Sequence, residues 1–257
     1  MLASLFADPR PLSPGVDMVL EGLGGAAFAD NATSPDAALL TLDAYAYFGG
    51  DPSSDGADGL IGLLDDRWRL IVGDQQWLSR VQSQISGTAR IQRMTFSRDA
   101  LDIEALRQQA RSVSDAFEIV ATNLDIAQRM ITDVGSELIG VFPSPEAFVE
   151  SGFGYVAIRE GKIVCGATAA MSATNAIEIQ ITTARSARRQ GLAAAVSAAL
   201  IAHCLERGVE PHWSTTNQSS RGLAEKLGYE VDGTYETLVR VPGGFLAPLL
   251  AKFLRPS

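Results

Sequence analysis

The stretch AIEIQITTARSARRQGLAAAVSAALIAHCLERG, residues 176–208, predicts a strand, a basic turn and a long helix in direct succession. Isoleucines alternate with polar residues over 177–182, which is the pattern of a strand with one buried face. From Leu192 onward, apolar side chains recur at the spacing of a helix that buries one stripe. Gly208 follows in the position where a left-handed cap ends a helix.

The turn before this helix is suited to an anion. The first turn of a helix has unpaired N–H groups and carries the positive end of the helix dipole. Gly191 has no β-carbon, so a ligand can approach the backbone, and Arg188 and Arg189 add fixed positive charge. The spacing alone leaves a second reading open, in which the turn is solvated and merely precedes a core helix.

A second stretch, PHWSTTNQSSRGLAEKLGY at residues 211–229, predicts a short strand, a polar turn and a short helix. Together the two stretches resemble the GNAT superfamily of N-acetyltransferases. Residues 188–193 match the family's diphosphate loop, Gln/Arg-x-x-Gly-x-Gly/Ala, and Asn217 with the Lys-Leu-Gly-Tyr of 226–229 matches its second block. SPEAFVESGFGYVAIREGKIVCGA, residues 144–167, resembles the branch labelled GNAT acetyltransferase, and the whole resemblance covers about 117–240.

The resemblance implies an α/β (α+β) fold, with a mixed, centrally splayed sheet flanked by helices. It also implies acetyl-CoA as co-substrate, no metal, and transfer of the acetyl group to a primary amine by direct attack in a ternary complex. The residues expected to bind the donor are Ile181, Thr182, Thr183, Arg188, Arg189, Gln190, Gly191, Leu192, Ala193, Asn217, Ser220 and Lys226. For Asn217, a role as helix cap is an alternative or an addition.

The catalytic groups expected from the resemblance lie along the strand of residues 176–183. A backbone group left unpaired at Ile181 or Thr183 would polarise the thioester and hold its oxyanion, a contribution of about 3 kcal/mol. An amine must lose a proton to attack, and Glu178, opposite the isoleucine face, is the candidate base. Its alternative role is an ion pair with an arginine; Glu146 and Glu150 are weaker candidates for the base.

One departure from the family pattern concerns the acid that protonates the leaving thiolate. Many members have a Tyr seven residues after the Asn of the second block, and here Ala224 stands there. Ser214 is the candidate we name as its substitute, with Thr215, Ser219, Ser220 or water as alternatives. The departure keeps open a CoA-binding sensor or interaction module with weak catalysis, and an enzyme acting on protein or peptide amines is a further alternative.

The acceptor is expected on the side of the sheet covered by residues 142–153. The net charge of −9 favours a cationic partner, here a small cationic amine. The candidate contacts are Glu146, Phe148, Glu150 and Phe153. The competing interpretation is that Phe148 belongs to the core and the glutamates are solvated.

Three regions are expected: an N-terminal α/β domain of unknown role at 1–113, the acetyltransferase domain at 114–245, and an apolar tail at 246–257 that packs on the body or touches a membrane or partner. The N-terminal elements expected are a strand, or else a helix, at 37–48, a strand at 67–72, a helix capped by Asp74, a strand at 90–96 and a helix at 102–113. Asp51, Asp55 and Asp58 lack the spacing of a calcium loop. In the core we expect a strand at 116–121, helices opened by Asn123 and by Ser144 or Pro145, and a hairpin around 160–162.

Composition narrows the class of protein. The chain has 257 residues with 46% hydrophobic content, and its negative charge argues against nucleic-acid binding. With two cysteines and two histidines, the composition argues against a disulfide framework and against a zinc site. No apolar run reaches membrane-spanning length and no signal peptide is recognised, so we expect a cytoplasmic monomer or homodimer that binds no membrane. No internal repeat is visible in the sequence.

Overall fold

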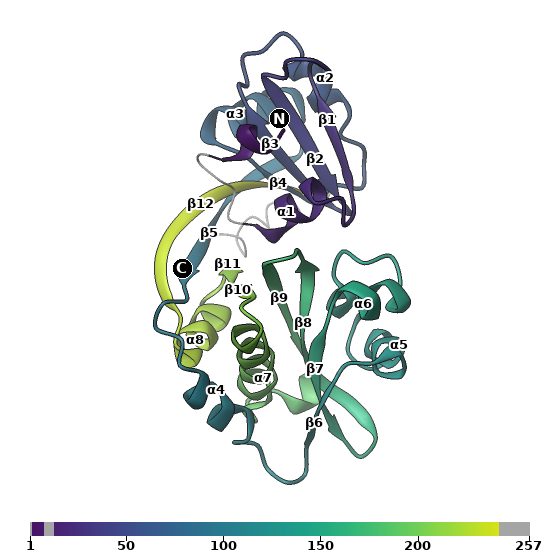
Figure 1. Ribbon diagram of the computed structural model, residues 1–257, viewed down its shortest axis with the longest axis vertical. Coiled ribbons are helices and arrows are strands. Elements are labelled where there is room, and N and C mark those ends of the chain that lie inside the picture. Colours follow the sequence, from purple (N-terminus) through teal and green to yellow (C-terminus); the bar gives the residue numbers. More distant parts are fainter. Residues whose placement is uncertain (1, 8–12, 242–257) are drawn as a thin grey trace. The chain divides into compact units, whose positions relative to one another are not determined.

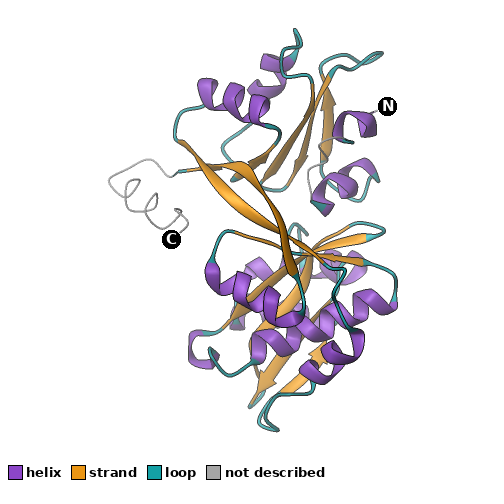
Figure 2. Ribbon diagram, turned by 90° about the vertical axis from the view of Figure 1, so that its left-hand side faces the viewer, coloured by secondary structure: helices purple, strands orange, loops and turns teal. Residues whose placement is uncertain are grey.

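The structure is a computed structural model that describes residues 2–7 and 13–241, arranged in two compact units. The first unit holds the described residues up to 95 together with 215–217 and 233–241, and the second holds 96–214 and 218–232. In each unit helices flank a sheet (Figures 1 and 2). The predicted tail at 246–257 lies outside the described residues. The limits 1–113 and 114–245 stay a prediction, because compactness alone does not delimit a domain.

The first unit is built on a seven-stranded sheet with the order β1-β2-β3-β4-β12-β5-β11. Most of its elements come from the first part of the chain: η1 (Leu2–Phe6), α1 (Pro14–Leu20), β1 (Ala26–Ala29), β2 (Ala37–Leu42), β3 (Tyr45–Gly50), α2 (Ala57–Gly62), β4 (Leu70–Val72), α3 (Gln75–Gln84) and β5 (Thr88–Ser97). The later strands β11 (Ser214–Thr215) and β12 (Glu230–Arg240) complete it, and β12 pairs antiparallel with β4.

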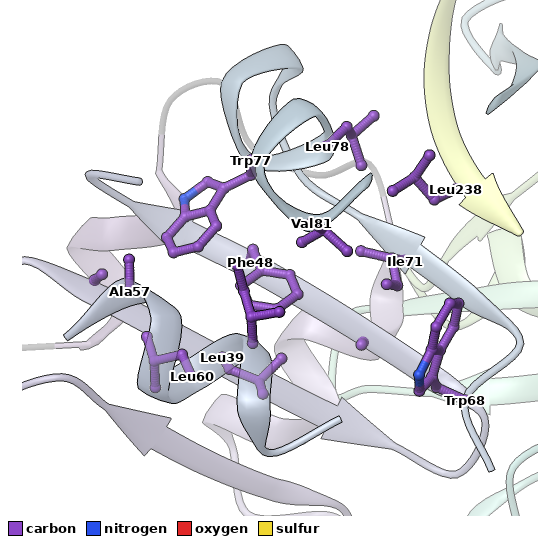
Figure 3. Close-up of a cluster of buried hydrophobic side chains, with 13 residues drawn as sticks. Leu39, Phe48, Ala57, Leu60, Trp68, Ile71, Trp77, Leu78, Val81 and Leu238 are labelled. Carbon is purple, nitrogen blue, oxygen red and sulfur yellow. The ribbon is translucent and has the colours of Figure 1, made fainter. Parts of the chain in front are cut away.

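The core of this unit forms where α3 packs on the sheet (Figure 3). The rings of Phe48 and Trp77 stack with centroids 4.7 Å apart, a contact worth roughly 0.5–1.5 kcal/mol beyond burial. The indole N–H of Trp77 donates to the Gly50 carbonyl at 2.9 Å, which satisfies its polar group. Leu238 of β12 is fully buried in the same cluster. Asp74 caps α3 as predicted, accepting from the Trp77 amide.

Two expectations for this unit are wrong in detail. Residues 37–48 form a hairpin rather than one element, because Asp43 takes a left-handed φ of 49° and turns the chain between Leu42 and Tyr45. Residues 67–69 are not strand, since the Asp65 carboxylate accepts from the Arg67 amide at 2.8 Å and holds a turn. Only Leu70–Val72 of the predicted strand is extended and paired.

The second unit is built on a five-stranded sheet with the order β10-β9-β8-β7-β6. Its pairs are antiparallel except β9–β10, which is parallel. Its elements are α4 (Ile103–Ala110), β6 (Glu118–Ala121), α5 (Leu124–Asp133), η2 (Ser136–Ile139), α6 (Pro145–Ser151), β7 (Gly154–Arg159), β8 (Lys162–Ser172), β9 (Ala176–Thr183), η3 (Arg185–Ala187), α7 (Leu192–Glu206), β10 (Glu210–His212) and α8 (Gln218–Leu227).

Helices cover both faces of this sheet (Figure 1), and each face has its own cluster of buried apolar side chains. On one face, the predicted apolar stripe of α7 packs on the buried side of β9, including Ile177. On the other face, α5, η2 and α6 pack around Met130, Leu138 and Phe148. The predicted caps are confirmed, since Asn123 and Ser144 accept from backbone amides of α5 and α6. The predicted turn at 160–162 joins β7 to β8.

The two units repeat one order of elements. The order β1-β2-β3-α2-β4-α3-β5 in the first corresponds to β7-β8-β9-α7-β10-α8-β12 later in the chain, apart from the short η3 and the two-residue β11. The senses of pairing also agree, with two antiparallel pairs followed by a parallel one. The topology is therefore repeated although no repeat is visible in the sequence. None of the described helices is long and apolar enough to cross a membrane.

Candidate active site

A cavity of about 620 Å³ lies in the second unit where β9 leads through the basic turn into α7. Its walls come from the end of β9, the turn, the first residues of α7 and one side of α8. They are Ile181, Thr182, Thr183, Ala187, Arg188, Arg189, Gly191, Leu192, Ala193, Ala194, Ser219, Leu223 and Lys226. Most of the residues predicted to bind a donor are therefore brought together around one space.

The first turn of α7 presents its backbone N–H groups without a side-chain cap. Gly191 is the N-cap residue in a left-handed conformation, φ 81°, and it has no side chain to accept from these groups. A β-carbon built on Gly191 would meet nothing within 4 Å. By contrast, five other helices have a side-chain acceptor at the N-cap: Ser13, Asp74, Asp102, Asn123 and Ser144. The turn is thus open to an acceptor from outside the chain.

Three cations line this cavity without a counter-ion. Within residues 2–7 and 13–241, no carboxylate lies within 4.0 Å of Arg188, Arg189 or Lys226. The Nε of Arg188 donates to the Thr183 carbonyl at 3.3 Å, which leaves its other donors available. Three cations beside uncapped N–H groups make the cavity a site for a multiply charged anion.

The outer edge of β9 is open near the cavity. The last pair between β10 and β9 is His212 with Glu178. Past that pair, no strand of the described chain lies beside β9 on that side. Strand pairing on this edge therefore ends at Glu178, which leaves a gap beside the rest of β9.

The register of β8 against β9 decides which backbone groups face this gap. The Ala184 amide donates to the Val164 carbonyl, so this is a bonded pair of the antiparallel ladder. Bonded and non-bonded pairs alternate, so Ile181 and Thr183 are non-bonded and direct their N–H and C=O groups away from β8. The bond from Arg188 to the Thr183 carbonyl agrees with that direction. Both residues thus offer backbone groups to the gap.

The candidate base and the candidate acid are hydrogen-bonded to each other. The Ser214 hydroxyl donates to Glu178 Oε1 at 2.7 Å, although the residues are 36 positions apart. Neither residue lines the cavity, which begins three residues further along β9 at Ile181, roughly 10 Å at 3.3 Å per residue. Tyr229 lies behind this pair, donating to the Pro211 carbonyl at 2.8 Å, and burial raises its pKa well above the usual value.

The remaining predicted donor contacts lie outside the cavity walls. Gln190 donates to the Ser186 carbonyl at 3.3 Å, and Ser220 accepts from the Trp213 indole at 3.1 Å. The Asn217 amide donates to Thr215 Oγ1 at 3.2 Å. Sequence reasoning did not name three of the lining residues, Ala187, Ala194 and Leu223, and it named Ser219 only as an alternative proton donor. A helical count from Lys226 would have found Leu223, because residues three apart share a face.

A carboxylate that sequence reasoning did not single out stands beside the cavity. Thr182, which lines the cavity, donates through its hydroxyl to Glu137 Oε1 at 3.2 Å. Glu137 lies on η2, whose Leu138 carbonyl accepts from the buried Thr168 hydroxyl at 2.7 Å. The next residues are held as well, since the Val141 amide donates to the Ala170 carbonyl at 3.0 Å. The carboxylate is therefore carried by a fixed turn on the face of β9 opposite α7.

The four predicted acceptor residues are not brought together. Phe148 is fully buried and packs edge-on against Phe142, so its side chain belongs to the core. Glu146 and Glu150 are exposed on α6; hydrogen bonds from its own backbone amide and from Ser144 lower the pKa of Glu146. Phe153 packs on the α7 face instead, 5.1 Å from the His203 ring.

The described aspartates of the acidic loop and the two cysteines form neither a metal site nor a reactive thiol site. Asp58 is bound by Arg80 at 2.7 Å, and Asp51 accepts from Ser53. No group of three or more potential metal ligands occurs among the described residues. Burial raises the pKa of Cys165 to about 11 and that of Cys204 to about 12, so both thiols stay neutral near pH 7.

Comparisons with known proteins identify the family and the fold. The model of the family described as GNAT acetyltransferase matches residues 4–238. An uncharacterized N-acetyltransferase of Bacillus subtilis, YdfB, is 24% identical over 222 residues, 82% of this chain and 84% of the relative. A GCN5-related N-acetyltransferase-like protein from Streptococcus suis has 27% identity and a TM-score of 0.82, covering 93% of this chain and 96% of its own. A putative GNAT acetyltransferase from Novosphingobium aromaticivorans shares the fold, with 20% identity, a TM-score of 0.57, and coverage of 89% and 97%.

Proposed function

The chain belongs to the GNAT acetyltransferase family, and on this premise we propose that it transfers an acetyl group from acetyl-CoA to the primary amine of a small cationic molecule. The observation that carries the proposal is the cavity at the start of α7, which combines an uncapped helix end, a left-handed glycine and cations without counter-ions. These are the features that a diphosphate group needs. Acetyl-CoA supplies the acetyl group as an activated thioester.

The donor's diphosphate is proposed to bind the N–H groups between Arg189 and Ala193. Arg188, Arg189 and Lys226 would neutralise its charge. The remainder of the donor would run along the open edge of β9, where Ile181 and Thr183 offer backbone groups. This direction leads from the cavity toward Glu178.

The chemistry proposed for the chain is positioning, oxyanion binding and removal of one proton. The amine nitrogen bonds to the thioester carbonyl carbon, the carbon–sulfur bond breaks, and CoA leaves as a thiolate. The Ile181 N–H would hold the developing oxyanion, worth about 3 kcal/mol. Glu178 would take the proton that the amine loses, and binding donor and amine side by side supplies the rest through proximity.

The hydrogen bond between Ser214 and Glu178 changes the role that we propose for Ser214. An ionised carboxylate can only accept, so the hydroxyl proton of Ser214 is directed at Glu178 and not at the thiolate. We therefore propose Ser214 as the residue that positions the base. Ala224, at the usual position of the acid, is fully buried. Water is then the proposed proton source for the thiolate.

A cationic acceptor is supported by the carboxylates on its side of the sheet. Glu137 stands at the rim of the cavity with no Lys, Arg or His within 4.0 Å among the described residues, and Glu178 lies on the same face of β9. Glu146 and Glu150 add exposed negative charge on α6. The net charge of −9 adds long-range attraction for cations. Phe148 is left out of the proposal because it is buried.

One assay distinguishes this function from a CoA-binding sensor. Release of free thiol from acetyl-CoA is measured with a panel of amines, amino acids, polyamines and aminoglycosides, and peptides with free amines test the protein-directed alternative. Thermal stabilisation by CoA is measured in parallel, because a sensor would show stabilisation without turnover. Replacing Arg188 and Arg189 together by Ala should remove most of that stabilisation. If CoA stabilises this variant as much as the wild-type protein, the basic turn does not bind CoA.

A further inference from the structure

A second hollow in the same unit lies between α4 and α7 and is separate from the donor cavity. It measures about 260 Å³ and is lined by Arg107, Ala110, Arg111, Tyr155, Ala199, Ala202, His203 and Glu206. Three alanines form part of its wall, which leaves space where larger side chains would meet. Its volume lies just below the range of roughly 300–1,000 Å³ typical of pockets for drug-sized ligands, so any ligand must be small.

A chain of hydrogen bonds determines which group in this hollow donates and which accepts. Arg207 Nη1 lies 3.3 Å from His203 Nε2, and a guanidinium can only donate, so this nitrogen is the acceptor. A neutral imidazole then carries its proton on Nδ1, which lies 3.1 Å from the Tyr155 hydroxyl. Burial and the nearby Arg207 lower the pKa of His203, which favours the neutral ring. His203 is thus the donor, and Tyr155 keeps its own hydroxyl proton for another acceptor.

That acceptor is missing among the described residues. None of them accepts from Tyr155 apart from the His203 contact already accounted for. The guanidinium of Arg111 likewise has no hydrogen bond or ion pair to a described residue, although it lines the hollow. Tyr155 and Arg111 therefore both present N–H or O–H donors without a partner. Two hydrogen-bond donors that line one small hollow define a site for a group that only accepts hydrogen bonds.

The charges around the hollow agree with an anion once the existing pairs are subtracted. Arg107 is bound by Glu104 and by Glu206, the latter at 2.6 Å, so this group of one cation and two carboxylates keeps one negative charge. Arg207 donates to His203 and stands at the end of α7, where a cation offsets the helix dipole. Arg111 likewise stands at the end of α4. Its interaction with the helix dipole uses no hydrogen bond, so the N–H groups of its guanidinium stay available to a ligand. Arg111 and Arg207 outweigh the surplus carboxylate, so the three arginines and two glutamates together carry one net positive charge.

We propose that this hollow binds a small oxyanion, a carboxylate or phosphate group, held by the Arg111 guanidinium and the Tyr155 hydroxyl. His203 is a positioning residue, because it orients the Tyr155 hydroxyl and does not itself face the anion with a free proton. The rings of Phe153 and Tyr155 pack on its ring, with centroids 5.1 and 5.9 Å away. The site is independent of the acetyl-transfer proposal, because it shares no residue with the donor cavity.

Nuclear magnetic resonance of the histidine rings tests this site in the full chain. The chain has two histidines, His203 and His212, so the first reports on the hollow and the second is an internal control. Sodium phosphate and sodium succinate are titrated separately at constant ionic strength, with CoA present in excess to fill the donor cavity. A saturable shift of His203 with no shift of His212 is expected for at least one of the two. Which of them binds identifies phosphate or carboxylate as the preferred group.

Matched variants distinguish a specific anion-binding site from nonspecific electrostatic attraction of anions to the protein. Arg111→Gln should weaken binding roughly tenfold or more, since it removes a charged hydrogen-bond donor. Tyr155→Phe should weaken binding less, because the guanidinium remains. Arg129→Gln is the control, as it removes the same charge from α5, away from the hollow, and should leave the affinity unchanged. The proposal is overturned if neither anion produces a saturable shift, or if Arg111→Gln and the control respond alike.

Discussion

The strongest prediction concerns Gly191, because the chain contains a matched control on the same helix. Gly191 precedes α7 with φ 81°, and Gly208 follows it with φ 68°. A β-carbon at either position would meet nothing within 4 Å. Valine at either site therefore costs backbone strain alone, about 1–2 kcal/mol, which lowers the melting temperature by roughly 2–8 °C at this chain length. The two variants should be destabilised to a similar extent.

They should differ only in their response to CoA. At a CoA concentration of 100 times Kd, binding stabilises the native protein by about 2.7 kcal/mol, or roughly 5–11 °C. Gly208→Val should keep this shift. In Gly191→Val the side chain would occupy the space proposed for the diphosphate, and a hundredfold loss of affinity would reduce the stabilisation to about 0.4 kcal/mol, near 1 °C. Differential scanning fluorimetry with and without CoA measures both. The reasoning fails if Gly191→Val keeps the wild-type shift, or if Gly208→Val loses as much.

Three further predictions concern the base, the acceptor side and the thiols. Glu178→Gln should lower kcat by roughly a hundredfold or more and flatten the acidic limb of the pH–rate profile, while the CoA-induced thermal shift survives; near-normal turnover would move the base elsewhere. Replacing Glu146 and Glu150 by Lys should raise KM for a cationic amine and leave KM for acetyl-CoA alone; an unmoved acceptor KM would contradict this placement. Because burial raises the pKa of Cys165 to about 11 and of Cys204 to about 12, their stabilising contribution should be complete below the unfolded value near 9 and be lost as pH rises toward those values. Urea unfolding from pH 8 to 11 checks the sign, and a stability that rises over this range would contradict it.

Several elements of the second unit could be predicted from the sequence because short-range patterns determine them. Alternation at 177–182 and the Gly191 turn predicted β9 and the start of α7, because both depend on neighbours within a few residues. The caps Asn123 and Ser144 were predicted for the same reason, since a cap bonds to an amide three residues away. The family motifs in the sequence then predicted most of the residues that line the cavity.

What the sequence did not reveal depends on contacts between distant residues. The turn at Asp43 lacks glycine and proline, and a single Asp within an apolar run was the one local sign that residues 37–48 divide into two strands. The bond between Ser214 and Glu178, and the approach of Glu137 to Thr182, depend on the packing of separate elements. The repeated order of elements left no visible sequence repeat, because topology requires only the pattern of apolar residues and not their identity.

The position of β12 bears on how the protein is made. In the sheet of the first unit this strand lies between β4 and β5, yet from Gly233 onward its residues follow the whole second unit in the chain. On the ribosome, the first unit therefore cannot close its sheet when its own strands emerge. At a synthesis rate of about 5–20 residues per second, residues 97–233 take roughly 7–27 s. During that interval the edges of β4 and β5 remain open to other chains or chaperones. The first part of the protein to be synthesised is thus among the last to be completed.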